Sequence, residues 1–382
     1  MNPRFAQRAL FSIFASFGLM VGLWSASIPP LQLQLKLSAD MLGASIFCFG
    51  MGAVCATFVA PKYIMRHQTR PVMIFGGCMM WLVFPFILIA PSVAIFMLLL
   101  ALLGFFCGVL DSSMNSHAFT VEHFLQKPCL SMLHGGFSLG SVLGSAFAAL
   151  IIGLSFSLHV ATFVVAVCAI GALLYAQSYC YASDTVEGGD AANVNTDMAR
   201  IPLSLMVIAA LTAISFFSEG AIGDWAGLFL RDEKSATASQ TALSMGAFAT
   251  GMTIARFLGD DLRARFDTLP LLTASSVLAG VMMLGFLFAP NAVWALIALL
   301  IAGLGYANVV PLLFVRAANI NGIASARGVA FVAGMGYASL LGGPALLGYI
   351  GEHFGIKIAM SLVVIGAVIL SFESWRATKK PA

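Results

Sequence analysis

Charged residues are scarce in this sequence. They make up 9% of the chain, against roughly 25% in an average soluble domain. Hydrophobic residues make up 60%, and the mean hydropathy is +0.97. These values exclude an ordinary soluble enzyme. The alternating pattern of a transmembrane β-barrel is also missing, so the apolar content predicts membrane-spanning helices.

Motifs of nucleotide-driven and metal-dependent chemistry are missing as well. There is no Walker-type G-x-x-x-x-G-K-[ST] run, so nothing indicates ATP as an energy source. An H-E-x-x-H helix and a cluster of His and Cys residues are likewise absent from the sequence. The seven cysteines form no C-x-x-C pair and lie mostly in apolar segments, which is typical of small packing residues. We therefore expect no enzyme activity, no cofactor and no metal site.

The sequence is rich in apolar segments of membrane length. A spanning helix needs about 20 apolar residues, and twelve segments fit this length. They are residues 9–30, 41–61, 71–90, 92–118, 131–153, 158–178, 202–228, 240–259, 269–289, 291–315, 327–349 and 356–375. We predict an all-α membrane protein with a six-helix bundle over 1–178, a polar cytoplasmic linker over 179–201 and a second six-helix bundle over 202–382. We expect a monomer.

The basic residues are distributed unequally between the two sides of the membrane. If the N-terminus is cytoplasmic, fifteen of the 19 Lys and Arg residues fall at or near inside ends. Those that fall outside are Lys36, Arg231, Lys234 and Lys357. This bias predicts that both termini are cytoplasmic. The net charge of +3 therefore reflects topology, and we expect membrane lipids but no nucleic acid as partners.

The two halves of the chain resemble each other. Gly22-Leu23-Trp24-Ser25 returns as Gly223-Asp224-Trp225-Ala226, 201 residues later. Such repeats predict two pseudo-symmetric bundles with the solute site between them, near the bilayer midplane. Trp24 and Trp225 would then be equivalent. They would either anchor the protein at the membrane interface or stack on a sugar ring in a central cavity.

One acid lies in an otherwise apolar segment. Asp111 follows the apolar run 98–109, Asn115 is one helical turn further on, and Glu122 is about three turns further on. Ionisable residues inside spanning helices are costly and usually functional. We predict that Asp111 and Asn115 bind solute hydroxyls and that Asp111 and Glu122 take part in proton coupling. The alternative is that Asp111 only pairs with a neighbouring helix.

The second half offers a further acid of the same kind. Glu219 is predicted in the outer half of segment 202–228, where it serves as a second residue for proton coupling and solute binding. Asp224 is interpreted as a solvated or structural charge near the helix end. Arg256 is interpreted as an ion-pair partner of Asp260, one turn away.

The whole chain resembles the major facilitator superfamily in its six-plus-six helices and basic loops. Residues 61–70 keep only the first and last basic positions of the G-x-x-x-D-R-x-G-R-[RK] loop signature. Leu110-Asp111-Ser-Ser-Met-Asn115 looks like the L-E-x-x-x-N segment of fucose-permease-like sugar:proton symporters. This resemblance implies a role for Asp111 and Asn115 in proton or sugar binding and a bacterial inner-membrane location. The family's intramembrane aspartate in helix 1 has no counterpart here.

The sequence therefore predicts a secondary transporter that moves a small polar solute, sugar or sugar-like, with protons. One alternative is a proton-driven exporter of amphipathic compounds. Segment 131–153 has a stripe of Gly136, Gly140 and Gly144, which allows close helix packing, but it lacks the proline of the antiporter pattern G-x-x-x-G-P. Another alternative is a non-transporting sensor or scaffold. We disfavour it because the chain ends six residues after Arg376.

Overall fold

The computed structural model describes residues 2–182, 201–320, 323 and 325–378, without the side chains of 260, 261, 263, 264, 325, 326, 377 and 378. The first six helices are α1 (Pro3–Leu35), α2 (Ala39–His67), α3 (Thr69–Ile87), α4 (Val93–Leu125), α5 (Leu130–Gly153) and α6 (Leu158–Ala176). A short turn, η1 (Gln177–Tyr179), follows them. Most of the predicted linker, residues 183–200, lies outside the described residues.

Seven helices follow in the described part of the second half. They are α7 (Leu203–Lys234), α8 (Ala238–Ala242), α9 (Ser244–Arg265), α10 (Thr268–Leu287), α11 (Ala292–Ala318), α12 (Ser325–Phe354) and α13 (Ile356–Thr378). Eleven of the helices in the described part of the chain are long and apolar enough to cross a membrane. The remaining long helix, α9, covers the segment predicted at 240–259. The all-α, two-bundle fold is therefore confirmed, whereas the linker boundaries stay a prediction.

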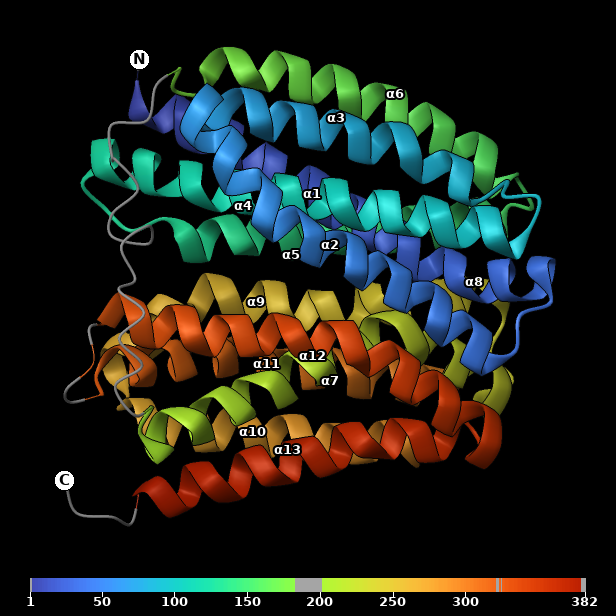
Figure 1. The fold of residues 1–382 in the computed structure, drawn as a ribbon. Coiled ribbons are helices and arrows are strands. Elements are labelled where there is room, and N and C mark those ends of the chain that lie inside the picture. The colour runs from blue at the N-terminus through green and yellow to red at the C-terminus, as the bar shows by residue number, and fades with distance from the viewer. Residues whose placement is uncertain (1, 183–200, 321–322, 324, 379–382) are drawn as a thin grey trace.

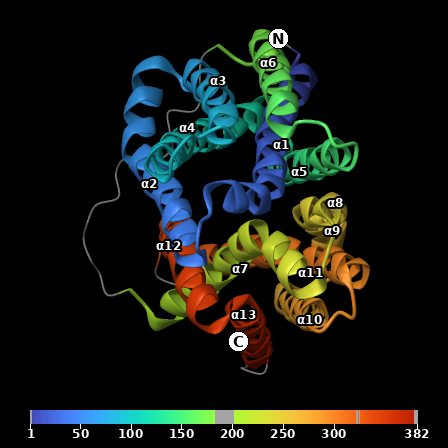
Figure 2. The same ribbon diagram turned by 90° about the vertical axis from the view of Figure 1, so that its right-hand side faces the viewer.

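Figures 1 and 2 show α1–α6 gathered in one bundle and α7–α13 in the other. The bundles meet chiefly where α2 packs against α12 and where α5 packs against α9, with smaller contacts between α1 and α7 and between α5 and α8. Both described chain ends lie at the same end of the molecule (Figure 1). We call this end the terminal side and the opposite end the far side.

The internal repeat is visible in how helices touch within each bundle. In the first, Gly52 of α2 lies against the main chain of α4, and Gly104 of α4 lies against that of α2. In the second, Gly251 of α9 and Gly303 of α11 make the same reciprocal contact. Each glycine and its counterpart are 199 residues apart. The repeat therefore runs at an offset of 199.

This offset corrects the predicted equivalence of the two tryptophans. Trp24 corresponds to Gly223, and Trp225 lies two residues beyond that position. Because successive helix residues are about 100° apart, two residues turn a side chain to nearly the opposite face. Trp24 is partly exposed, whereas Trp225 is 1% exposed. The shared Gly-x-Trp letters were a coincidence of sequence, although both residues do lie on corresponding helices.

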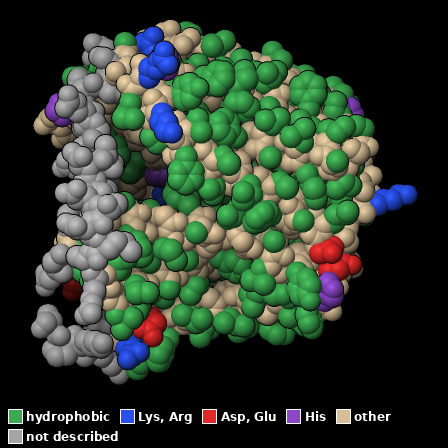
Figure 3. All heavy atoms as spheres, in the orientation of Figure 1, with side chains coloured by type: hydrophobic (Ala, Val, Ile, Leu, Met, Phe, Trp, Pro, Cys, Tyr) green, Lys and Arg blue, Asp and Glu red, His purple; other side chains and the backbone are tan. Residues whose placement is uncertain are grey.

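Along the α2–α12 pair, the two bundles touch mainly at the far side. Gly43 lies against Pro344 and Gly348, and Gly50 lies against Leu341. These contacts fall in the first half of α2. On the terminal side, the space-filling view shows a hollow between the bundles with His and Lys or Arg side chains visible inside it (Figure 3). The molecule is thus open toward the terminal side.

Candidate functional site

Asp111 lies where α4 of the first bundle faces α12 of the second. Its Oδ1 accepts a hydrogen bond from Asn115 Nδ2 at 3.0 Å, which also donates to the Asp111 main-chain oxygen at 2.8 Å. Its Oδ2 accepts a longer bond from the Tyr337 hydroxyl at 3.4 Å. The predicted acid–amide pair is therefore joined by a tyrosine from the opposite bundle. Tyr337 is 47% exposed, so this cluster borders open space.

A second cluster of charged and polar side chains surrounds Glu219 on α7. Arg256 of α9 interacts electrostatically with Glu219, and Tyr306 of α11 does so as well. Arg256 Nη1 crosses to the first bundle, where it donates to the main-chain oxygen of His134 at 3.3 Å and to the hydroxyl of Ser138. The cluster therefore spans three helices of the second bundle and α5 of the first.

The interpretation of Arg256 as an ion-pair partner of Asp260 involves a side chain that lies outside the described residues, so it stays a prediction. The guanidinium is directed across the bundle interface to α5. Arg256 is nine residues before the end of α9 at Arg265. The geometry thus places a cation among the predicted site residues, where the sequence analysis had none.

The sequence around Ser138 spells a pattern that is known from hydrolases. Gly136-Phe137-Ser138-Leu139-Gly140 has the letters G-x-S-x-G, but these residues lie inside α5. A nucleophile elbow needs a sharp strand-to-helix turn that exposes the serine. Ser138 is 2% exposed, and its hydroxyl donates to the His134 main-chain oxygen at 3.2 Å. The pattern therefore carries no hydrolytic chemistry here.

Asp224 is a third acid at the interface between the bundles. It lies closer to the far side of the molecule than the Glu219–Arg256 cluster does. Its Oδ1 accepts a hydrogen bond from Trp24 Nε1 at 3.1 Å, and the neighbouring Gly223 main-chain oxygen accepts one from Ser25 Oγ at 2.5 Å. α7 continues for ten residues beyond Asp224 to Lys234. Asp224 is therefore not an end-of-helix charge, as interpreted from the sequence, but part of the contact between α1 and α7.

Two predicted site residues lie elsewhere. Trp225 lines a pocket of about 260 Å³ on the far side, so in this conformation it is not available to a solute at Asp111. Glu122 Oε1 accepts hydrogen bonds from the main-chain N–H groups of Cys129 and Leu130 at 2.6 and 2.9 Å. These groups begin α5, whose N-cap side chain makes no such bond. The contacts assign Glu122 to capping α5, while its proton-coupling role stays a prediction.

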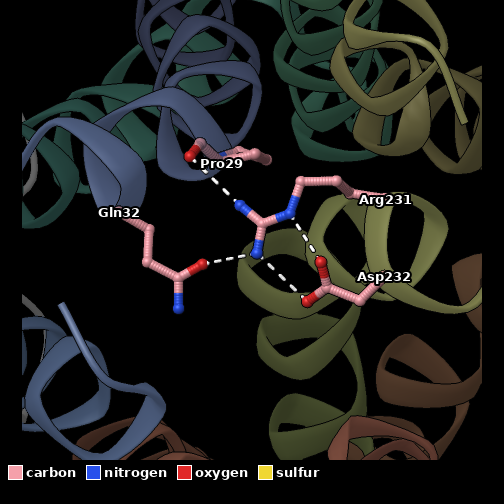
Figure 4. A network of polar contacts seen from close by, with 4 residues as sticks. All are labelled: Pro29, Gln32, Arg231 and Asp232. Carbon is pink, nitrogen blue, oxygen red and sulfur yellow. Dashed lines mark hydrogen bonds and ion pairs between the residues drawn. The ribbon is translucent and has the colours of Figure 1, made fainter. Parts of the chain in front are cut away.

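The far side is closed by an arginine between α1 and α7 (Figure 4). Arg231 Nη1 donates to the main-chain oxygen of Pro29 at 3.3 Å, and Nη2 donates to Gln32 Oε1 at 2.7 Å. Asp232 holds the guanidinium from the other edge, with Nε to Oδ1 at 2.6 Å and Nη2 to Oδ2 at 3.0 Å. Arg231 thus connects the two bundles where a solute would have to enter or leave.

We expect Arg231→Ala to favour opening of the far side, because it removes both hydrogen bonds to α1. A net loss of about 1 kcal/mol for each of the two bonds raises the open population relative to the closed one by up to about 30-fold. Spin labels at exposed Leu33 and Glu233, in a cysteine-free background, report the separation of α1 and α7. Lys36→Ala, which removes an exposed cation on the same side, is the control. An unchanged distance distribution in Arg231→Ala contradicts the closing role.

Two bundles of spanning helices that enclose acids and an arginine define a multi-pass membrane transport protein. Residues 9–322 match the family model described as Major Facilitator Superfamily. The chain belongs to this superfamily of membrane transporters.

The chain is similar to other transporters at 25% sequence identity or less. An uncharacterized MFS-type transporter of Yersinia pestis is 25% identical over 349 residues, which cover 91% of this chain and 89% of the relative. The crystal structure of a mutant of the nucleoside transporter NupG has a TM-score of 0.74 at 12% identity and covers 99% of this chain and 100% of its own. The Escherichia coli fucose:proton symporter FucP has a TM-score of 0.61 at 16% identity, with full coverage of both chains. These structures establish the fold.

Proposed function

We propose that this protein moves a small polar solute of the sugar or sugar-like class together with protons by alternating access. The observation that carries the proposal is the contact of Asp111 on α4 with Tyr337 on α12. A carboxylate inside a spanning helix typically marks a solute or proton pathway. Here the carboxylate also contacts the opposite bundle. Binding of a proton or a solute at Asp111 would therefore change the contact between the bundles.

The chemistry of the cluster suits a hydroxylated solute. The Asp111 carboxylate accepts hydrogen bonds, the Asn115 amide both donates and accepts, and the Tyr337 hydroxyl does the same. A solute hydroxyl can replace the 3.4 Å bond from Tyr337 with a shorter one to the carboxylate. Solute binding would then exchange a contact between the bundles for contacts to the solute.

Alternating access needs contacts that close one side while the other is open. The Trp24–Asp224 and Arg231–Gln32 bonds close the far side in this conformation. We propose the bacterial inner membrane as the location, with the terminal side in the cytoplasm because most Lys and Arg residues lie there. In that orientation the described conformation is open to the cytoplasm. We further propose that the protein works as a monomer.

Uptake into liposomes that contain the purified protein tests this function. A panel of labelled sugars, sugar acids and amphipathic drugs is offered with and without an imposed pH gradient. We expect at least one polar solute to accumulate with the gradient and to be lost when a protonophore is added. Accumulation that ignores the protonophore contradicts proton coupling. Movement of amphipathic compounds alone favours the exporter instead.

Glu219 is the second acid of the proposed pathway. We expect Glu219→Gln to weaken solute binding or to shift the pH profile of transport, because the amide keeps the shape but cannot exchange a proton. We also expect it to act non-additively with Asp111→Asn, since both residues would serve one cavity. Melting temperature and affinity are measured for both single variants and the double variant. A lower melting temperature with unchanged affinity and pH profile leaves Glu219 a structural role only.

A further inference from the structure

Arg256 is a cation in a spanning helix whose hydrogen bonds all go to neutral acceptors. Its Nη1 alone makes the bonds to His134 and Ser138. Within the described part of the chain, no partner is recorded for Nε or Nη2 and no ion pair for the guanidinium. Arginine stays charged in proteins and presents five N–H donors. Three of them are therefore available to a ligand.

The surroundings of this guanidinium suit an anion. Arg256 is partly exposed and lies at the bundle interface, where α9 meets α5. The titratable groups that interact with it or with its neighbour Glu219 are few: Glu219 on α7, His134 on α5 and Tyr306 on α11. Glu219 is the one acid among them, and it interacts through space without a direct ion pair. Among the described side chains, Glu219 alone offsets the charge of the guanidinium.

We propose that Arg256 binds an anionic group of the transported solute, so that the solute belongs to the class of small hydroxylated acids such as sugar acids. This inference rests on the proposed function and narrows its substrate class. The free edge of a guanidinium, Nε with Nη2, matches the two oxygens of a carboxylate. Meanwhile the Asp111–Asn115–Tyr337 cluster binds the hydroxyls.

The charges of the empty and loaded site explain why such a solute suits proton coupling. In the empty site, the charge of Glu219 faces that of Arg256. In the loaded site, the solute anion takes the place of that charge, and a proton on Glu219 removes the repulsion between two neighbouring anions. The net charge around Arg256 is then the same before and after loading. One anion moved with one proton transfers no charge, so this step does not respond to the membrane potential.

Matched pairs of probes test the inference by binding. Glucose with glucuronate, and galactose with galacturonate, differ in whether the last carbon is an alcohol or a carboxylate. Thermal stabilisation and calorimetric affinity are measured for each probe on the purified full chain. We expect stabilisation by at least one acid and a weaker effect or none from its neutral partner. We expect Arg256→Gln to weaken acid binding by roughly 10- to 100-fold, the change that follows from losing a charge-assisted hydrogen bond.

Control variants separate anion binding from a structural role of Arg256. Arg256→Lys keeps the charge without the planar fork, so it should retain the preference for acids at lower affinity. Ser138→Ala removes the side-chain acceptor on α5 but keeps the main-chain oxygen of His134, and it should leave the preference intact. Arg316→Gln on α11 changes the net charge equally, away from the two clusters, and should leave acid binding unchanged. If Arg256→Gln fails to fold, the preference retained in Arg256→Lys and Ser138→Ala still decides the matter.

Three results would overturn the inference: none of the acids binds, neutral sugars bind as well as their acids, or acid binding survives in Arg256→Gln. If neutral sugars bind and accumulate with the pH gradient, the proposed function stands and only the anionic class is wrong. If an acid binds through Arg256 but its uptake does not depend on the pH gradient, the anionic class stands and proton coupling is wrong. The two proposals therefore fail separately.

Discussion

Asp111→Asn is expected to abolish accumulation driven by a pH gradient and to leave the protein folded. The amide retains the shape of the carboxylate, and its oxygen can still accept the 3.0 Å bond from Asn115 Nδ2. Its nitrogen would face the Tyr337 hydroxyl, which can rotate and accept a hydrogen bond. The variant therefore keeps its hydrogen bonds. What it loses is a group that can bind and release a proton.

The measurement compares uptake with and without the pH gradient in liposomes that contain equal amounts of folded protein. Asp267→Asn is the matched control, because it neutralises an exposed carboxylate that makes no side-chain cap at α10. Facilitated equilibration of solute without accumulation is the expected behaviour of Asp111→Asn. Accumulation against the gradient with unaltered pH dependence would remove Asp111 from the coupling mechanism.

Gly52→Ala is expected to be strongly destabilising. A Cβ at this position would lie 1.9 Å from the main-chain oxygen of Ala101. Backbone cannot yield as a flexible side chain does, so α2 and α4 must move apart. Overpacking of this kind costs about 1–3 kcal/mol, and more where no side chain can adjust. Gly251→Ala should have the same effect, since its Cβ would lie 1.9 Å from the Leu300 oxygen.

Gly171→Ala on α6 is the control for both variants. A Cβ there meets nothing within 4 Å, and alanine is the better helix former by about 1 kcal/mol. Thermal unfolding in detergent should therefore show an unchanged or higher melting temperature for Gly171→Ala and a clear decrease for the other two. Equal melting temperatures for all three would mean that the bundles tolerate wider helix spacing than the structure indicates.

The spanning helices were predictable because a lipid bilayer constrains the sequence strongly. Every main-chain group in the hydrocarbon region needs an internal partner, so apolar length alone indicates a helix. The helix ends were less predictable. Segment 92–118 belongs to α4, which continues to Leu125, because polar residues beyond the apolar run can extend a helix into the headgroup region.

The candidate site was predictable only where it is local in sequence. Asp111 and Asn115 are one turn apart, so helical geometry alone brings them together. Tyr337 reaches Asp111 across 226 residues, and Arg256 reaches Ser138 across 118. No periodicity encodes such contacts, since they depend on how the bundles dock. Tyr337 is a polar residue amid the glycines of α12, and the sequence analysis did not single it out.

The two flanks of the molecule are not alike, and this has a mechanical consequence. α5 and α9 touch near the terminal side, where Gly135 lies against Phe257, and again toward the far side, where Gly246 lies against Ser145. The α2–α12 flank touches near the far side. A rotation of one bundle about the α5–α9 line displaces atoms in proportion to their distance from it. The opening between the bundles therefore widens most at α2 and α12, the flank opposite the hinge formed by α5 and α9.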